Sequence, residues 1–459
     1  MTSTALPPIP GAAPEAAVQV VGSPAQRIRI TAERLRVWGI RSALSVLDQG
    51  LTAAVGFGVN VVLARWLSPT AYGAFAVAFA TFLLISGFYN VLLLEPLTVM
   101  GPSRHSHRLP AYFREQVVLH VLLVGVLAAL ILVAGAVFWW LSPDNPLAGA
   151  LLGSGLALPF MTLLWLIRRM CYVLQQPSFA LLGSGFYVSF VFCGFLLLRH
   201  FQHIDPLTAF GLMGIGSLLS ALVLWLKLDL KQTQTPREPQ RMLWREAARE
   251  NWSYGRWLVG STALSSISNQ VQMFLVASTV GLGAAGVLRA MQIPGLVMTH
   301  VNSATGLLIL PAFSYDFGNG SIARLRHKAS LVSLALGGGT LAFAAALALT
   351  ASRTEHLLYG GKYAEYAWLM PVLALVPTAL GGSIGYSMAL RAMHRPHFDL
   401  VANSIAAPVG VISAIVLMRW WGLGGAAASI VLSYATYAVM TCWIYRAAAQ
   451  RSRKELCKT

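Results

Sequence analysis

Charged residues are scarce in this sequence. Aspartate, glutamate, lysine and arginine make up 11% of its 459 residues, whereas hydrophobic residues make up 56%, and the mean hydropathy is +0.65. Soluble domains carry roughly 25% charged residues, so this chain has too little polar surface to cover a soluble globule of its length. A soluble enzyme is therefore excluded, and the lipid bilayer is expected to be the solvent.

Acidic residues are the rarer of the two charge types. The chain has 16 of them against 33 lysines and arginines, which gives a formal net charge of +17. Such a charge can indicate a nucleic-acid partner, but here the basic residues are spread over short loops between apolar runs of about 20 residues, as membrane insertion requires. We therefore expect no nucleic acid and assign the charge to orientation and to contact with anionic membrane lipids.

Cysteine is also rare, with four residues in the chain and no CxxC or paired spacing among them. This excludes a disulfide framework or a cysteine metal site as the purpose of the chain. No GxxxxGK[ST] motif is present, so the chain is not expected to hydrolyse ATP. The first 40 residues lack the short apolar core and cleavage site of a signal peptide. We expect neither a metal nor a cofactor.

The apolar runs predict twelve spanning helices, with boundaries accurate to about two to four residues. An even number of spans places both termini on one side of the membrane, called here the near side, and most basic residues fall there too. The near side is therefore predicted to be cytoplasmic. The opposite side is called the far side. The expected spans cover residues 42–64, 72–100, 115–140, 147–168, 178–198, 206–226, 254–280, 284–312, 329–350, 365–390, 398–418 and 422–445.

A charged segment between the sixth and seventh spans divides the chain into two halves. Both halves enter the membrane from the same side, so they can be parallel repeats about an axis along the membrane normal. Two short similarities support a repeat: one pairs Gly73 with Gly286 after a turn, and the other pairs Pro177 with Pro396. The expected organisation is a flexible cytoplasmic tail at 1–40, an N-lobe at 41–227, a cytoplasmic linker at 228–252, a C-lobe at 253–446 and a basic cytoplasmic tail at 447–459.

The end of the first span, VVLARWLSPTAYGAFAVA at 61–78, resembles the polysaccharide and O-antigen flippases of the multidrug, oligosaccharidyl-lipid and polysaccharide exporter superfamily. Gly286, Arg289 and Pro294 resemble the counterpart segment in the second half, and the resemblance covers about residues 40–446. It implies an all-α integral membrane protein of two six-helix lobes, related by pseudo-two-fold symmetry around a central cavity that opens alternately to the two sides.

The same resemblance implies a function. Its members move a lipid-diphosphate-linked oligosaccharide outward across the bacterial inner membrane, for the synthesis of exopolysaccharide, O-antigen or lipopolysaccharide. Lipid II flippases have two additional C-terminal spans that this sequence lacks, which argues against a peptidoglycan precursor as cargo.

Arginines inside the membrane are candidate functional residues, because an ionised side chain there costs about 2.5 to 3.5 kcal/mol on insertion scales. Arg289 could bind the diphosphate of a lipid carrier, since a guanidinium offers a fixed fork of donors to phosphate oxygens. Equally, it could extend to the far interface and need no cargo. Arg65, at the far end of the first span, is either a gating residue or an interfacial anchor.

Two acidic residues are candidates for ion coupling or gating. Asp48 could take up a proton or a sodium ion whose inward movement powers transport, or it could pair with Arg41. Glu95 precedes Pro96, which frees a carbonyl and bends the helix where a cavity mouth has to move. The alternative for Glu95 is a helix-end carboxylate that meets water or Arg104.

Polar side chains of the seventh and eighth spans are the candidates for lining the translocation cavity together with Arg289. Amide groups of this kind can recognise sugars, although packed helices in lipid also use them for interhelical hydrogen bonds. The candidates are Asn269, Gln270, Gln272, Gln292, His300 and Asn302.

Three functional classes fit a chain of this kind to different degrees. An integral-membrane glycosyltransferase or polymerase would need a large far-side loop with acid and base groups, and the longest such loop, 351–364, offers few. We therefore expect no enzyme. A cation-coupled multidrug exporter remains the alternative, and would present an acidic cavity. Arg289 favours a flippase for undecaprenyl-diphosphate-linked oligosaccharide, with a polysaccharide polymerase or co-polymerase as a candidate protein partner.

Overall fold

The structure, a computed structural model, describes residues 24–228, 244–266, 270–319, 321–393, 395 and 397–456. The described residues form helices and short connections without a strand, so the chain is all-α as expected. The elements of the first half are α1 (Pro24–Trp66), α2 (Pro69–Tyr89), η1 (Asn90–Leu94), α3 (Glu95–Arg104), η2 (Ser106–Arg108), α4 (Leu109–Leu141), α5 (Pro146–Val173), α6 (Pro177–His200) and α7 (Pro206–Lys227). Those of the second half are α8 (Trp244–Ser266), α9 (Gln272–Thr279), α10 (Leu282–Gly318), α11 (Ile322–Tyr359), η4 (Ala364–Tyr366), α12 (Leu369–Leu373), α13 (Leu375–Ala392) and α14 (His397–Leu456).

Several helices of the first half start at a proline that follows a capping residue. Proline suits the first helical position because its missing N–H would have no partner there. Before Pro69, the Ser68 hydroxyl accepts the N–H of Ala71. Before Pro206, the Asp205 side chain accepts the N–H of Thr208 at 2.7 Å. These caps fix where the chain turns back into the membrane.

Within the described ranges, ten helical segments are long and apolar enough to cross a membrane, and the protein is a multi-pass membrane protein. The last segment, 397–448, contains Gly422, whose φ of 52° and ψ of −124° are not helical. This segment therefore covers both the eleventh and the twelfth expected spans. The expected seventh span is divided between α8 and α9, and residues 267–269 between them lie outside the described residues.

Three helices extend into segments that were expected to be tails or a linker. α1 begins at Pro24, inside the segment 1–40 that was expected to be a flexible tail. α8 begins at Trp244, inside the expected linker, and α14 continues to Leu456, inside the expected tail. The reason is that backbone hydrogen bonding carries a helix past the end of its apolar stretch until a cap or a helix breaker ends it.

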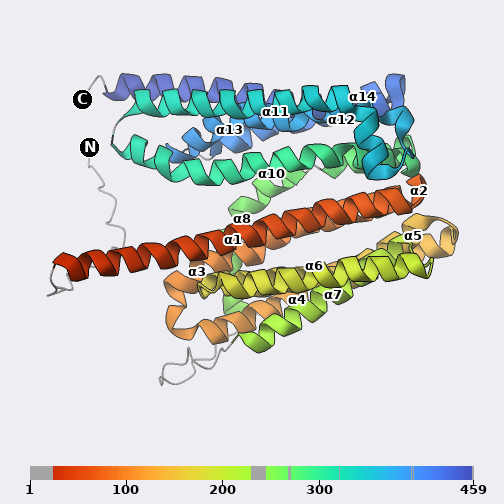
Figure 1. The fold of residues 1–459 in the computed structure, drawn as a ribbon, viewed down its shortest axis with the longest axis horizontal. Helices are drawn as coiled ribbons and strands as arrows, with labels where there is room; N and C mark the ends of the chain where they lie inside the picture. The colour runs from red at the N-terminus through yellow and green to blue at the C-terminus, as the bar shows by residue number, and fades with distance from the viewer. Residues whose placement is uncertain are drawn as a thin grey trace, which may run out of the picture.

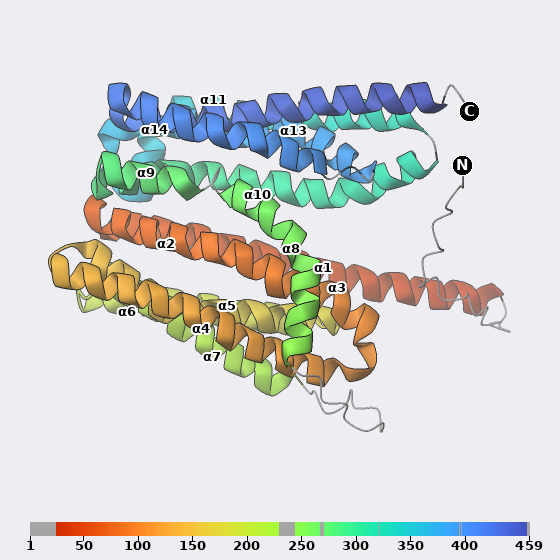
Figure 2. The same cartoon turned by 180° about the vertical axis from the view of Figure 1, so that it is seen from behind.

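The helices form two layers, one from each half of the chain (Figure 1). α1 to α7 make the N-lobe and α9 to α14 the C-lobe, while α8 crosses from one to the other (Figure 2). α1 begins and α14 ends at the same end of the bundle, on the left in Figure 1, which is the near side. The two layers diverge toward that end and approach each other at the far side.

The buried side chains reflect this shape. One large hydrophobic core contains residues of both lobes, including Phe75 and Ala76 of α2 and Leu288 and Met291 of α10. A second, smaller core belongs to the C-lobe alone and lies among α10, α11, α13 and α14, with Phe313 among its members. The lobes therefore share their packing in one region, where α2 meets α10.

Gly73 of α2 and Gly286 of α10 bring the backbones of the two lobes into close contact. A Cβ atom on Gly73 would lie 1.7 Å from the Leu282 carbonyl oxygen, and one on Gly286 would lie 2.3 Å from that of Pro69. Only glycine allows two backbones to come this close. The two residues paired by the sequence repeat thus contact each other, as expected of equivalent positions beside a pseudo-two-fold axis.

Proline interrupts two other helices. Pro96 has no N–H to donate four residues back, and the five residues before α3 form a π-helical turn, η1, in which the Glu95 N–H bonds the Asn90 carbonyl. Pro377 likewise leaves the Leu373 carbonyl without its usual donor, and the tenth expected span is divided there into α12 and α13. The helix is thus irregular next to Pro96, where the sequence predicted a bend.

Candidate functional site

A cavity of about 280 Å³ lies between the lobes. Its wall is formed by α2 on one side and by α9, α10, α12, α13 and α14 on the other. The lining residues are Ala76, Phe79, Ala80, Leu83, Gln270, Gln272, Met273, Arg289, Gln292, Gly295, Leu296, Thr299, Leu373, Val376, Pro377, Leu380, Ile430 and Tyr434.

Arg289 is the one charged side chain among these lining residues. It is half-buried and lies one turn of α10 beyond Gly286, where α10 contacts α2. Its Nε donates to Asn60 Oδ1 at 3.3 Å, and its guanidinium carbon lies 5.7 Å from the centre of the Phe79 ring. A polar acceptor and an aromatic face both offset the cost of placing a cation in the membrane.

Asn60 joins the two lobes at this point. It lies on α1, is buried, and its Oδ1 accepts both the Arg289 Nε and the Tyr72 hydroxyl, the latter at 3.2 Å. Because its Nε is bound to Asn60, Arg289 is held against the cavity wall. The structure therefore places Arg289 on the wall of the cavity.

The polar candidates of the seventh and eighth spans fall into two groups. Gln270, Gln272 and Gln292 line the cavity together with Arg289. Gln272 is 4% exposed and, within the described part of the chain, its Nε2 has no hydrogen-bond partner. An amide N–H₂ buried in this way can donate to a ligand oxygen.

The remaining candidates lie elsewhere. Asn302 is buried and its Nδ2 donates to the Pro377 carbonyl at 2.8 Å, so it joins α10 to α13 by the interhelical bonding considered as its alternative. His300 is exposed and is not among the cavity-lining residues. Asn269 lies outside the described residues.

Asp48 lies inside the N-lobe, where it is fully buried. Arg168 Nη2 donates to its Oδ2 at 2.6 Å, the Tyr172 hydroxyl donates to the same oxygen, and Ser184 Oγ donates to Oδ1 at 2.5 Å. Its ionic partner is thus Arg168 of α5, not Arg41. Three groups from α5 and α6 converge on this one carboxylate of α1, which satisfies it as a buried charge requires.

A second, smaller cavity of about 50 Å³ adjoins this ion pair. Thr52, Arg168, Ser184, Tyr187 and Ser217 are among its polar lining residues. It is large enough for water, which needs roughly 10 to 15 Å³ and two or more polar partners. The N-lobe therefore has a polar site of its own, separate from the cavity at Arg289.

Glu95 is part of a polar chain on the same lobe. Its Oε1 accepts Asn90 Nδ2 at 3.1 Å, and Asn90 Oδ1 accepts Arg169 Nη2 at 3.4 Å. Arg104, the partner considered from the sequence, is not the one observed. Asn90 begins the π-helical turn and Glu95 follows it, so the polar chain lies at the irregular part of the helix.

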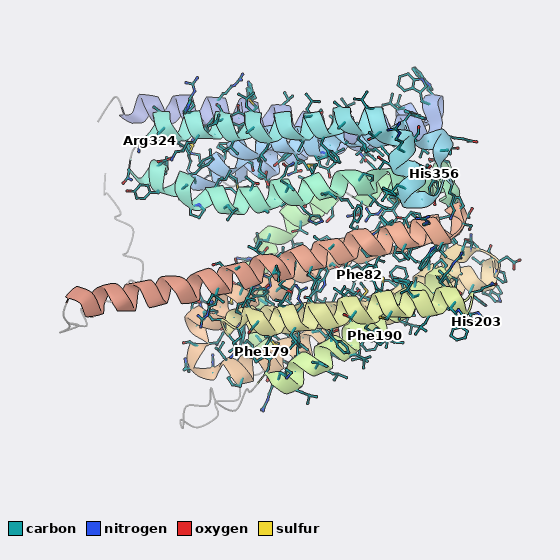
Figure 3. The ribbon with its side chains drawn as sticks, viewed as in Figure 1. Phe82, Phe179, Phe190, His203, Arg324 and His356 are labelled. Atoms are coloured by element: carbon teal, nitrogen blue, oxygen red, sulfur yellow. The ribbon has the colours of Figure 1, made fainter. Side chains whose placement is uncertain are left out.

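Arg65 lies at the far-side end of α1, where its Nη1 donates to the Leu357 carbonyl of the C-lobe at 3.2 Å. Beside it, Lys362 of the C-lobe contacts carbonyls at the end of α1. His203 of the N-lobe and His356 of the C-lobe mark this far-side end, and Arg324 marks the opposite end (Figure 3).

The first turns of α8 contact the N-lobe through polar residues that sequence reasoning did not single out. Glu250 Oε2 lies 2.8 Å from His105 Nε2, and Asn251 exchanges hydrogen bonds with Gln116 at 3.0 and 3.3 Å. The ring of His105 also stacks on Tyr112, with centroids 4.2 Å apart. These contacts hold α8, the helix that leads into the C-lobe, against the near-side part of the N-lobe.

The fold and the sequence family of this chain both connect it with known proteins. None of the curated proteins matches the sequence. Among solved structures, the fold is similar to an inward-facing multidrug resistance MATE family transporter of the MOP superfamily, with a TM-score of 0.72, 12% identity, and coverage of 89% of this chain and 99% of that one.

The fold is also similar to the lipid II flippase MurJ in an inward closed conformation, with a TM-score of 0.70, 14% identity, and coverage of 88% and 87%. An outward-facing MATE family transporter gives a TM-score of 0.57 at 12% identity, with coverage of 90% and 95%. These solved structures are transporters and flippases, not enzymes. In sequence, residues 42–315 match a family described as polysaccharide biosynthesis protein, which is more than half of the chain. The chain therefore belongs to the polysaccharide biosynthesis protein family.

Proposed function

We propose that this protein is a flippase that carries undecaprenyl-diphosphate-linked oligosaccharide outward across the bacterial inner membrane. The observation that carries the proposal is Arg289, a guanidinium held on the wall of a cavity between two lobes by Asn60. A cation at this place attracts a diphosphate, and a guanidinium binds its oxygens in a fixed geometry. The exported oligosaccharide would serve exopolysaccharide, O-antigen or lipopolysaccharide synthesis.

The rest of the cavity wall supports a sugar-bearing cargo. Gln270, Gln272 and Gln292 contribute amide groups that can donate to and accept from hydroxyls. Phe79 and Tyr434 contribute aromatic faces, and the remaining lining side chains are mainly aliphatic.

His300, Asn302 and Asn269 were candidates for the same wall, and we now base the sugar site on the three glutamines.

Alternating access of the two lobes is the proposed mechanism. The lobes meet at the far side through Gly73 and Gly286, and diverge toward the near side. The greater likeness to an inward-facing than to an outward-facing transporter supports a near-side-open state. In this state the diphosphate head would bind from the cytoplasm, while the lipid tail stays in the bilayer.

The proposed arrangement in the membrane places both termini in the cytoplasm. The excess of basic residues on the near side supports it. The lobes of the moving unit are 41–227 and 253–446, and a polymerase or co-polymerase would receive the cargo on the far side.

Asp48 is the proposed site of ion coupling. Protonation of its carboxylate would remove the charge that compensates Arg168, and the adjoining polar cavity gives water room to reach the pair. Glu95 and Arg65 are proposed to act in gating at the near and far sides respectively.

The test of the proposal is a gene deletion with complementation. Loss of the protein should cause lipid-diphosphate oligosaccharide to accumulate on the cytoplasmic side and surface polysaccharide to disappear. The intact chain should restore export. Arg289→Ala should lower export roughly tenfold to a hundredfold, since a hydrogen bond to a charged group contributes about 1.5 to 3 kcal/mol. Arg419→Ala, which removes an exposed arginine, should leave export unchanged.

The alternative is a cation-coupled multidrug exporter, which the likeness in fold to such a transporter favours. A site for lipophilic cations would need a carboxylate, and the lining residues include none. Unchanged glycan in the deletion strain, together with new sensitivity to lipophilic cations, would move the protein to that class.

A further inference from the structure

The far-side end of α1 is covered by a residue from the other lobe. α1 ends at Trp66, and the last carbonyls of a helix have no partner within it. Lys362 Nζ lies 3.2 Å from the Ala64 carbonyl oxygen, 2.5 Å from that of Arg65 and 2.7 Å from that of Leu67. An ammonium group has three donors and is favoured at the negative end of the helix dipole. Lys362 of the C-lobe therefore caps a helix of the N-lobe.

A cation of the N-lobe makes the reciprocal contact with a helix of the C-lobe. Arg65, near the end of α1, donates its Nη1 to the Leu357 carbonyl at 3.2 Å. Leu357 belongs to the last turn of α11, which ends at Tyr359, so its carbonyl is one of those left without a helical partner. Figure 3 shows the preceding residue, His356, at the far-side end of the C-lobe. Each lobe thus supplies one cation that caps a helix of the other.

A tight turn places Lys362 over α1. Gly360 and Gly361 have φ values of 72° and 84°, in the left-handed region that favours glycine. The Gly360 N–H donates to the His356 carbonyl at 2.9 Å and closes α11. Two successive left-handed residues reverse the chain, so that the next residue returns toward α1.

Tyr363 fixes the loop on both lobes. Its N–H donates to Oε1 of the buried Glu355 at 2.8 Å, which ties the loop to α11. Its hydroxyl donates to the Ala64 carbonyl at 3.1 Å, which ties the loop to α1. Burial, together with the neighbouring Glu355, raises the pKa of Tyr363, so the hydroxyl keeps its proton and remains a donor.

These hydrogen bonds join the two lobes, and opening of the far side would break them. We propose that Arg65 and Lys362 form a reciprocal helix-cap lock that holds the far side closed and breaks once in every transport cycle. Of these two residues, sequence reasoning suggested gating for Arg65 but not for Lys362. The lock rests on the proposed alternating access but not on the identity of the cargo.

The test measures far-side opening directly. A reporter, Leu296→Cys, is placed in the cavity wall of a chain whose native cysteines are changed to serine, and intact cells receive a membrane-impermeant maleimide. Lys362→Met keeps the aliphatic stem but removes the donors, and should raise the labelling rate about tenfold or more. Lys362→Arg should raise it less, since a guanidinium still donates. Arg353→Met, on an exposed residue of α11, is the matched control and should have no effect.

A second variant and a second reporter make the outcome decisive. Arg65→Met should raise labelling in the same sense, and the double variant should show less than the product of the two effects, because both residues close one interface. A far-side reporter, Asp144→Cys, should label equally in every background. Rates are normalised to protein that elutes as a single folded species.

Unchanged labelling in both Lys362→Met and Arg65→Met would overturn the lock, as would independent effects in the double variant. The result is separable from the proposed cargo, because the assay contains no glycan. Increased labelling in a strain whose lipid-linked glycan does not depend on the protein would support the lock and contradict the flippase.

Discussion

The buried ion pair of Asp48 and Arg168 restricts how Asp48 could act in ion coupling. The carboxylate is fully buried and accepts hydrogen bonds from Arg168, Tyr172 and Ser184. Removal of one member of a buried ion pair leaves an uncompensated charge and costs about 3 to 5 kcal/mol, more than the pair itself contributes. A coupling role for Asp48 must therefore include a change at Arg168.

We predict that Asp48→Ala and Arg168→Ala each destabilise the protein by about 3 to 5 kcal/mol, because each leaves its partner charged and buried. The double variant should be less destabilised than the two single effects combined. Unfolding of purified protein in detergent micelles measures the three values. Asp144→Ala, on an exposed far-side residue, is the control. Additive losses would show that the pair does not act as a unit.

A second prediction concerns Asn60, which holds Arg289. Asn60→Ala removes the acceptor for the Arg289 Nε and should lower export about tenfold, less than Arg289→Ala, because the guanidinium remains but is no longer positioned. Asn403→Ala is the matched control, since Asn403 donates to Asp399 of its own helix. Export equal to that of the intact chain would show that Arg289 does not depend on Asn60.

The sequence identified the charged residues of the site better than their partners. Arg289 and Asp48 stood out because charge is rare in apolar runs. Arg168 did not, because the expected fourth span ended on it and it resembled a near-side anchor, whereas α5 continues to Val173. Asn60 lies 229 positions from Arg289 in the sequence, and no local pattern connects two such distant residues.

At the scale of the element, the contact between α2 and α10 determines how closely the lobes can meet. The backbones approach through Gly73 and Gly286, where any Cβ atom would overlap the facing helix. Small residues allow such packing in membranes, where apolar burial alone contributes little to helix association. Closure of the far side therefore requires glycine, which has no side chain, at positions 73 and 286.

We predict that Gly73→Ala opens the far side. Its Cβ would lie 1.7 Å from the Leu282 carbonyl oxygen, and overpacking of this kind typically costs about 1 to 3 kcal/mol. The labelling rate of Leu296→Cys should rise roughly fivefold or more. Gly211→Ala, where a Cβ meets open space, is the matched control. A labelling rate equal to that of the control would show that the lobes tolerate a larger separation without opening.

Hydropathy predicted most of the helices and missed helical segments whose residues are polar. The far-side turns were located because apolar runs end in Pro, Gly and polar residues. The first half of α8 was assigned to a linker, since its residues from Trp244 are polar, yet it is stabilised by contacts of Glu250 and Asn251 with the N-lobe. Tertiary contacts of this kind leave no periodic signal in the sequence.

At the scale of the whole molecule, the path of α8 and α9 decides the orientation of the second half. α10 begins at the far side, because Gly286 near its start contacts Gly73 near the start of α2. The chain enters α8 from the near side, where Glu250 contacts His105. It must therefore cross the membrane between these points, although neither α8 nor α9 alone is among the ten described segments that are long and apolar enough to span it.

This path predicts that the two halves can be made as separate chains. A chain cut after Pro236, in the segment between α7 and α8, gives two fragments that both start on the near side. Each should insert in its native orientation, since the crossing through α8 and α9 returns α10 to the far side. Their lobes should then associate through the α2 and α10 contact and through α8. Co-expression should restore surface polysaccharide in the deletion strain, and neither fragment alone should do so.

A cut in a far-side loop is the informative control. A chain divided after Asp144 yields a second fragment that starts on the far side in the intact protein. Synthesised alone, it has to insert from the cytoplasm and would place its first spans in the inverted orientation, so it should not complement. Restored export after the cut at Asp144, or its absence after the cut at Pro236 while both fragments are inserted, would contradict the even number of spans in each half. Because insertion precedes association, this pair of cuts tests the topology without reference to cargo.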